Sequence, residues 1–116
     1  MSEGALVVRT IDDGAATVLE VTGRLEIGTL AIAREKFAEI VAGGGPVVLD
    51  LGHLTYLSSA GLRLIIIALK QAQANRQPFV IAGARSAVRH VLDSIGLRQF
   101  CPIYRNRTEA LAKLAS

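Results

Sequence analysis

Two adjacent serines, Ser58 and Ser59, have the side chains best placed for chemistry in this sequence. They follow the short apolar run Val47–Leu51, and the apolar residues after them recur at helical spacing over Leu62–Leu69. This pattern predicts a buried strand, a turn and a helix that begins at the serines. A serine oxygen there can accept a hydrogen bond from a free amide of the first turn, and the helix dipole favours an anion. The position therefore suits helix capping or a phosphate.

A nucleophilic role for the same serine would need a general base and an oxyanion site. His53 or His90 could supply the base together with an aspartate, but Leu57–Gly61 lacks the Gly-x-Ser-x-Gly elbow of serine hydrolases. Cys101 has no motif around it either, and a lone cysteine is usually a small buried hydrophobic residue. We expect no catalytic residue, and a small hydrolase using Ser59 is the least favoured alternative.

Metal and cofactor sites are not indicated by the sequence. The two histidines and the single cysteine are widely separated and lack the spacing of metal ligands. The glycines Gly43–Gly45 follow a predicted helix and lack the Lys-Ser/Thr of a phosphate-binding loop. We therefore expect no metal and no cofactor.

Length and composition indicate one domain over residues 1–116. Hydrophobic residues make up 51% and charged residues 20%, which favours a compact interior over disorder. With a net charge of only +3, scattered Lys and Arg, and 4% aromatic residues, we expect no nucleic acid partner. The apolar run Leu64–Leu69 is too short to cross a bilayer, and the N-terminal residues lack a signal pattern. We expect a cytoplasmic protein without membrane insertion, and a single cysteine agrees with a reducing compartment.

The first part of the chain predicts a hairpin, a bend and an amphipathic helix. Residues 6–11 and 16–22 have strand patterns and are separated by an Asp-Asp-Gly turn signal. Gly23 follows as a chain bend. Over residues 29–42 the apolar side chains have helical spacing, and the charged ones, Arg34 among them, fall mainly on the opposite side. We interpret these charges as a solvated face.

The second part of the chain predicts further strand and helix units. Residues 79–83 form a strand pattern, and a right-handed crossover would place this strand parallel to and near residues 47–51. Residues 88–95 have helical spacing, and residues 101–104 are extended. Thr108 is expected to cap a last helix. The predicted order is β-β-α-β-α-β-α-β-α, an α/β fold.

The residues around the serines resemble the central motif of the STAS family, which includes the bacterial anti-sigma factor antagonists. The family pattern is hydrophobic-Asp-Leu, a short loop and Asp-Ser-Ser/Thr-Gly-Leu, which resembles Leu49–Leu51 and Tyr56–Arg63. The register follows from Gly61 and Leu62, and Gly23–Glu26 resembles the family's Gly-x-Leu-Asp. The element order is similar as well, so the resemblance covers nearly the whole chain. It implies the STAS fold, a single mixed β-sheet with helices packed on it.

Carried over residue by residue, the resemblance implies phosphorylation at Ser59. Ser58 stands where the family has its aspartate, and it is the competing acceptor. Ala60 replaces the second Ser/Thr of the family motif. Asp50 is close to the serines in the sequence, and three roles are open for it: it could anchor the following turn, support the phosphorylation site as a neighbouring group, or stand close enough to repel a phosphate.

The function implied by the resemblance is regulatory and non-enzymatic. An anti-sigma factor antagonist sequesters a serine-kinase anti-sigma factor, releases a sigma factor, and is switched off by phosphorylation. The implied partners are that kinase, which has a histidine-kinase-like ATPase fold, and a metal-dependent serine phosphatase. The alternative is a STAS subunit of a lipid or anion transport system. The expected partner-binding residues are Arg24, Leu25, Ser58, Leu62 and Arg63. Of these, Leu62 could equally belong to the core.

Overall fold

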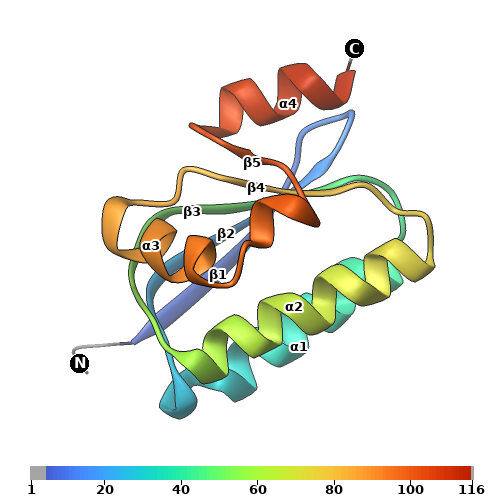
Figure 1. Ribbon diagram of the computed structural model, residues 1–116. Coiled ribbons are helices and arrows are strands. Elements are labelled where there is room, and N and C mark those ends of the chain that lie inside the picture. Colours follow the sequence, from blue (N-terminus) through green and yellow to red (C-terminus); the bar gives the residue numbers. More distant parts are fainter. Residues whose placement is uncertain (1–4, 116) are drawn as a thin grey trace.

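The computed structural model describes residues 5–115 as a five-stranded sheet with helices on both faces (Figure 1). The strands are β1 (Leu6–Asp12), β2 (Thr17–Leu25), β3 (Val47–Leu57), β4 (Phe79–Ala82) and β5 (Ile103–Tyr104). The helices are α1 (Leu30–Ala42), α2 (Ser59–Ala74), α3 (Ser86–Ser94) and α4 (Arg107–Ala115), with short 3₁₀ turns η1 (Ile27–Thr29) and η2 (Leu97–Gln99). The predicted α/β class and element order are confirmed.

The sheet is mixed, and its strand order follows the sequence: β1-β2-β3-β4-β5. β1 is antiparallel to β2, and all other neighbouring pairs are parallel. The predicted parallel pairing of the strands beginning at Val47 and Phe79 is confirmed, because these two residues are register partners. The crossover helices that parallel strands require are supplied by α1, α2 and α3.

Alternate residues of the central strands face two separate apolar layers. Leu49 and Leu51 lie in the main core together with buried residues of α1, α2 and α3. Val48 lies in a smaller cluster on the opposite face, together with Ala110 of α4. In Figure 1, α1 and α2 accordingly run side by side below the sheet and α4 lies above it. The period-2 alternation of β3 therefore separates the α2 side of the molecule from the α4 side.

β3 is longer than predicted, because the strand does not stop at Leu51 but continues to Leu57. Its neighbour β2 also continues past the predicted end, and the parallel register runs on to Leu25–Leu57 through two irregularities. One of them directly follows Gly23, whose φ of 110° favours glycine. The predicted bend is thus a bulge inside a longer strand, which carries both strands to the start of α2.

The last helix begins two residues earlier than predicted, and its N-cap is Asn106 instead of Thr108. The α4 helix begins at Arg107, so Thr108 is already inside it. The side-chain oxygen of Asn106 accepts a hydrogen bond from the Glu109 amide at 2.8 Å, and its carbonyl accepts one from the Ala110 amide at 3.1 Å. Both residues can cap a helix, so the sequence alone did not decide between them.

A buried ionic bridge fastens α4 to the sheet. The Arg107 guanidinium lies 2.6 Å from a Glu20 carboxylate oxygen on β2 and 3.0 Å from an Asp50 oxygen on β3. Both acidic residues are buried, at 9% and 6% exposure, which would be costly without a cation. The other Asp50 oxygen accepts a hydrogen bond from the Gly52 amide at 2.9 Å.

Candidate functional site

The first turn of α2 is closed by Ser58, which is the N-cap. Its backbone is extended, and its Oγ accepts a hydrogen bond from the Gly61 amide at 3.1 Å. Its own amide donates to the Leu25 carbonyl at 3.0 Å, and its carbonyl accepts from the Leu62 amide at 2.8 Å. Three hydrogen bonds therefore fix this residue between the end of β2 and the helix.

Ser59 has a different environment from its neighbour. It is the first residue of α2 and is exposed, and within residues 5–115 its hydroxyl makes no hydrogen bond. Of the two capping candidates in the sequence, Ser58 makes the cap and Ser59 is left with a free hydroxyl. A group on the Ser59 oxygen would stand next to the positive end of the helix dipole.

A close backbone approach sets the position of this turn. A Cβ on Gly61 would lie 2.7 Å from the Leu25 carbonyl oxygen and 3.0 Å from a Leu57 methyl carbon, so only glycine fits here without a shift. The helix start is thereby pressed against the ends of β2 and β3. Leu25 is fully buried in this contact and Leu62 is 8% exposed. We therefore correct the expectation for Leu25, whose side chain belongs to the core. For Leu62, which was expected either in the core or in a partner contact, the burial favours the core.

Arg24 lies at the surface beside Ser58–Gly61, which we call the serine turn, and its side chain is held in one orientation. Its guanidinium stacks over the Tyr56 ring at 4.2 Å from the centroid, and its Nε lies 3.2 Å from a Glu26 carboxylate oxygen. The Thr29 hydroxyl donates to the Arg24 carbonyl at 2.7 Å and fixes the backbone as well. A guanidinium restrained in this way loses little conformational entropy when it binds a partner.

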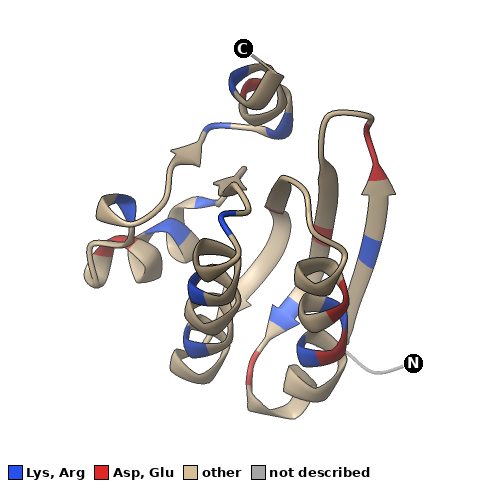
Figure 2. Cartoon of the chain, turned by 90° about the vertical axis from the view of Figure 1, so that its right-hand side faces the viewer, with Lys and Arg blue, Asp and Glu red and all other residues tan. Residues whose placement is uncertain are grey.

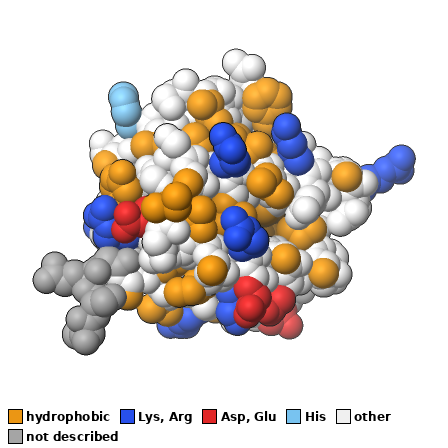
Figure 3. Space-filling model, turned by 90° about the horizontal axis from the view of Figure 1, so that it is seen from below, with side chains coloured by type: hydrophobic (Ala, Val, Ile, Leu, Met, Phe, Trp, Pro, Cys, Tyr) orange, Lys and Arg blue, Asp and Glu red, His pale blue; other side chains and the backbone are white. Residues whose placement is uncertain are grey.

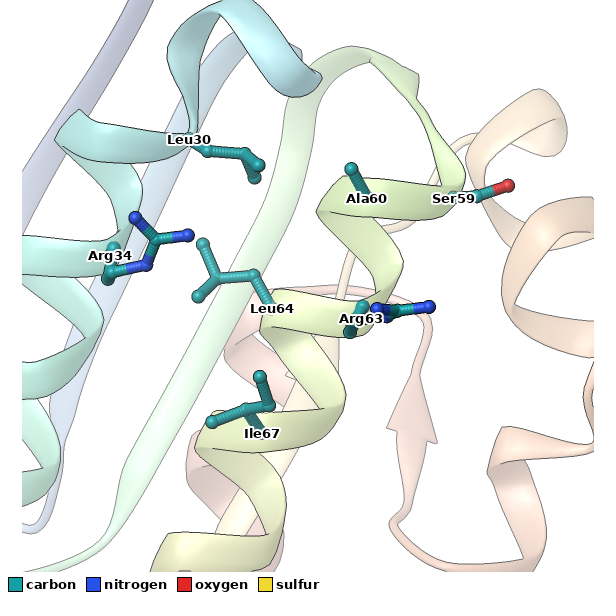
Figure 4. Close-up of a pocket in the computed structure, with 7 residues that line it drawn as sticks. All are labelled: Leu30, Arg34, Ser59, Ala60, Arg63, Leu64 and Ile67. Atoms are coloured by element: carbon teal, nitrogen blue, oxygen red, sulfur yellow. The ribbon is translucent and has the colours of Figure 1, made fainter.

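A groove of about 380 Å³ separates α1 from the first turns of α2. In Figure 4, Leu30 and Arg34 of α1 lie opposite Leu64 of α2, whereas Ser59 and Arg63 point away on the other side of α2. The groove has two arginines and no acidic residue among those that line it: Leu30, Arg34, Ser59, Ala60, Arg63, Leu64 and Ile67. Figure 3 shows this side of the molecule as hydrophobic side chains with Lys and Arg among them. The lining of the groove therefore combines apolar side chains with positive charge.

The STAS domain family model matches residues 6–110 of this sequence. The chain belongs to the STAS domain family. It is 36% identical over 78 residues to BtrV of Bordetella bronchiseptica, a protein named as an anti-sigma factor antagonist, and the match covers 67% of each chain.

Solved structures with the same fold include an anti-sigma factor antagonist from Mycobacterium paratuberculosis, with a TM-score of 0.88. That match is 19% identical and covers 99% of this chain and 98% of the other. The Bacillus cell fate determinant SpoIIAA, solved in its phosphorylated form, matches with a TM-score of 0.72 at 15% identity, covering 94% and 98%.

Three of the predicted partner-binding residues of this STAS domain, Arg24, Ser58 and Arg63, lie at or near the surface around the serine turn. Arg34 was missed, because its charge was interpreted as part of a solvated face. The available signal was its spacing: Arg34 follows Leu30 by four residues, so both share one side of α1. Only the packing of α1 on α2 shows that this side borders the groove that also reaches Ser59.

Asp50 anchors the turn that follows it, which is one of the three roles considered from the sequence. Its oxygens bond the Gly52 amide and the Arg107 guanidinium on the α4 side of the sheet, and neither bond reaches the serine turn. Asp50 is linked to Ser59 through the rest of β3, which ends at Leu57 just before the two serines.

The remaining reactive side chains of the STAS domain are not assembled into a site. His53 and His90 are exposed, and residues 5–115 contain no group of three His, Cys, Asp or Glu residues that could hold a metal ion. Cys101 is buried, and burial raises the pKa of its thiol to about 11, so it is a poor nucleophile at neutral pH. No helix in the described part of the chain is long and apolar enough to cross a membrane.

Proposed function

We propose that this STAS domain is an anti-sigma factor antagonist that sequesters a serine-kinase anti-sigma factor, releases a sigma factor, and is switched off by phosphorylation of Ser59. The observation that carries the proposal is the contrast between two neighbouring serines. The Ser58 oxygen is engaged by the Gly61 amide at 3.1 Å, whereas the Ser59 hydroxyl is exposed and without a hydrogen bond in residues 5–115. Support comes from BtrV, which is named as such an antagonist, and from phosphorylated SpoIIAA, which has the same fold.

The switch works by charge. A phosphate adds about −1.5 to −2 charges at neutral pH. On Ser59 this charge lies at the N-terminus of α2, and Arg63 follows four residues later on the same side of the helix (Figure 4). The domain can thus accommodate the phosphate without unfolding. A partner packed on the same turn would have to desolvate a dianion in a contact built for a hydroxyl.

The proposed docking surface is the serine turn with its two flanks. Arg24 on β2 forms one flank, and the groove residues Leu30, Arg34 and Ile67 form the other, with Arg63 beside the serine. The partner is a kinase with a histidine-kinase-like ATPase fold, which holds the ATP itself. A metal-dependent serine phosphatase reverses the modification. The STAS domain has no turnover of its own.

The deciding experiment is co-purification of the domain with its kinase, followed by incubation with ATP and mass spectrometry. Phosphate on Ser59 and release of the kinase are expected. Ser59→Ala should bind constitutively and Ser59→Asp should bind weakly, while both keep a cooperative thermal transition. Ser58→Ala is the matched control and should still be phosphorylated. Phosphate on Ser58 alone would move the switch by one residue, and no phosphate on either serine would favour a transport subunit.

The docking surface is tested separately by reversing charges. Arg24→Glu and Arg63→Glu should each weaken kinase binding about tenfold, because each change replaces attraction by repulsion at the edge of the contact. Arg76→Glu, at the opposite end of α2, is the control and should leave the affinity unchanged. Unchanged affinity in the Arg24 and Arg63 variants would show that the surface is elsewhere.

A further inference from the structure

A second pocket lies at the carboxyl ends of β4 and β5, apart from the serine turn. It has a volume of about 340 Å³ and is bordered by α3, η2, the chain after β5, and α4. Three arginines from three of these segments line it: Arg89, Arg98 and Arg105. Figure 2 shows basic segments around α3 and again where the chain passes from β5 into α4. In α/β sheets the carboxyl ends of the strands are the usual place for a ligand.

Two of these guanidiniums make surface contacts within the protein. Arg98 lies 3.4 Å from an Asp93 carboxylate oxygen and donates to the Ile103 carbonyl, also at 3.4 Å. Arg105 lies 3.5 Å from a carboxylate oxygen of Glu109, the one acidic residue in the pocket lining. These contacts are at the surface and contribute little to stability. Both arginines also border the same hollow.

Arg89 supplies charge that the protein does not neutralise. Its side chain is exposed and makes no ion pair or hydrogen bond within residues 5–115. Glu109 accepts a hydrogen bond from the Arg105 amide at 2.9 Å, and this bond lowers the pKa of its carboxyl, which therefore stays ionised. The pocket lining still carries three arginines against one carboxylate, so its charge is positive.

We propose that this pocket binds a small phosphate-bearing anion, with Arg89 as its principal contact. Guanidinium groups bind phosphate through two parallel hydrogen bonds, which is the geometry that converging arginines favour. A hollow of about 340 Å³ is at the small end of ligand sites and suits a diphosphate. The ligand would be a second input to the domain, separate from the state of Ser59.

The test is a titration with sodium pyrophosphate at constant ionic strength, followed by two-dimensional amide NMR. Saturable shifts are expected at Ala84, Arg89 and Tyr104. Arg89→Gln should lower the affinity about tenfold, and Arg89→Lys, which keeps the charge but loses the planar fork, should lower it less. The matched control is Arg76→Gln, just after the C-terminal end of α2 and outside both pockets, which should leave the affinity unchanged.

Three outcomes would overturn the proposal: shifts centred on the Ser58–Gly61 amides, shifts that rise linearly without saturation, or an Arg89→Gln variant that binds as well as the original chain. ADP, titrated in parallel, identifies the source of the phosphate. Tighter binding of ADP than of pyrophosphate would indicate a nucleotide, and equal or weaker binding would indicate an inorganic or other simple phosphate.

Discussion

Replacing Ser58 by alanine removes one hydrogen bond and leaves the rest of the serine turn intact. The amides of the first helical turn have no partner inside the helix, and the Ser58 oxygen satisfies one of them, that of Gly61, at 3.1 Å. The backbone bonds of Ser58 do not depend on its side chain. Loss of a serine N-cap typically lowers the free energy of unfolding by about 1 kcal/mol, and we expect that value here.

Ser59→Ala is the matched comparison, since it deletes the same atom one residue later. The Ser59 hydroxyl is exposed and makes no hydrogen bond within residues 5–115, and alanine is the better helix former. The free energy of unfolding should therefore change by less than about 0.5 kcal/mol. The residue that matters for stability and the residue that matters for switching are thus expected to be different.

Urea unfolding followed by circular dichroism separates the two variants. With a slope of about 1–3 kcal/mol per molar urea, a loss of about 1 kcal/mol lowers the midpoint by roughly 0.3–1 M for Ser58→Ala. The midpoint of Ser59→Ala should stay within error of the original. If Ser59→Ala proves as destabilising as Ser58→Ala, the assignment of cap and free hydroxyl is refuted.

Four further predictions concern the scaffold. Arg107→Met should lower the free energy of unfolding by about 2–3 kcal/mol, because it removes the cation that pairs with the buried Asp50 and leaves Glu20 with only the exposed Arg9 at 3.7 Å. Arg105→Met, which breaks an exposed pair, should cost less than about 1 kcal/mol, and equal losses in urea unfolding would contradict this. Gly61→Ala should cost about 1–3 kcal/mol, since the new methyl meets the Leu25 carbonyl, and a midpoint unchanged in urea would show that α2 can move away. Cys101 has a thiol pKa raised from 9.0 to about 11, so at about pH 8 only about one thiol in a thousand is ionised, and reaction with a disulfide reagent should be much slower than in urea. The same shift means that the folded state holds this proton more tightly than the unfolded state, so the thiol's contribution to stability is lost as the pH rises from about 9 to about 11. Cys101→Ala should therefore reduce the fall in melting temperature over this pH range, and an unchanged fall would contradict the prediction.

Most of the fold could be predicted from the regular spacing of apolar residues in the sequence. The spacing of apolar residues located all five strands and four helices, because burial of one face imposes a period on the chain. The ends of elements were less predictable. β3 continues past Leu51 only because β2 continues beside it, and that pairing is a tertiary contact that no local pattern records.

The serine turn was predictable, and its surroundings were not. A serine before a helical pattern indicates a cap, but the choice between Ser58 and Ser59 depends on which oxygen reaches the Gly61 amide. Leu25 was expected at the surface because it follows a bend, whereas the bulge keeps it in the sheet and under α2. Arg34 borders the groove because of how two helices pack, which helical spacing alone does not specify.

The bridge from Arg107 to Glu20 and Asp50 has a consequence for how the chain assembles. Each strand pairs with the strand that precedes it in the sequence, so the sheet can grow at one edge during synthesis, and no strand has to insert between two others. α4 follows all five strands in the sequence, so the face that carries both carboxylates can stay open to water until α4 packs on it. The helix that covers these carboxylates also brings the arginine that pairs with both of them. When α4 packs on the sheet, desolvation and charge compensation therefore occur together.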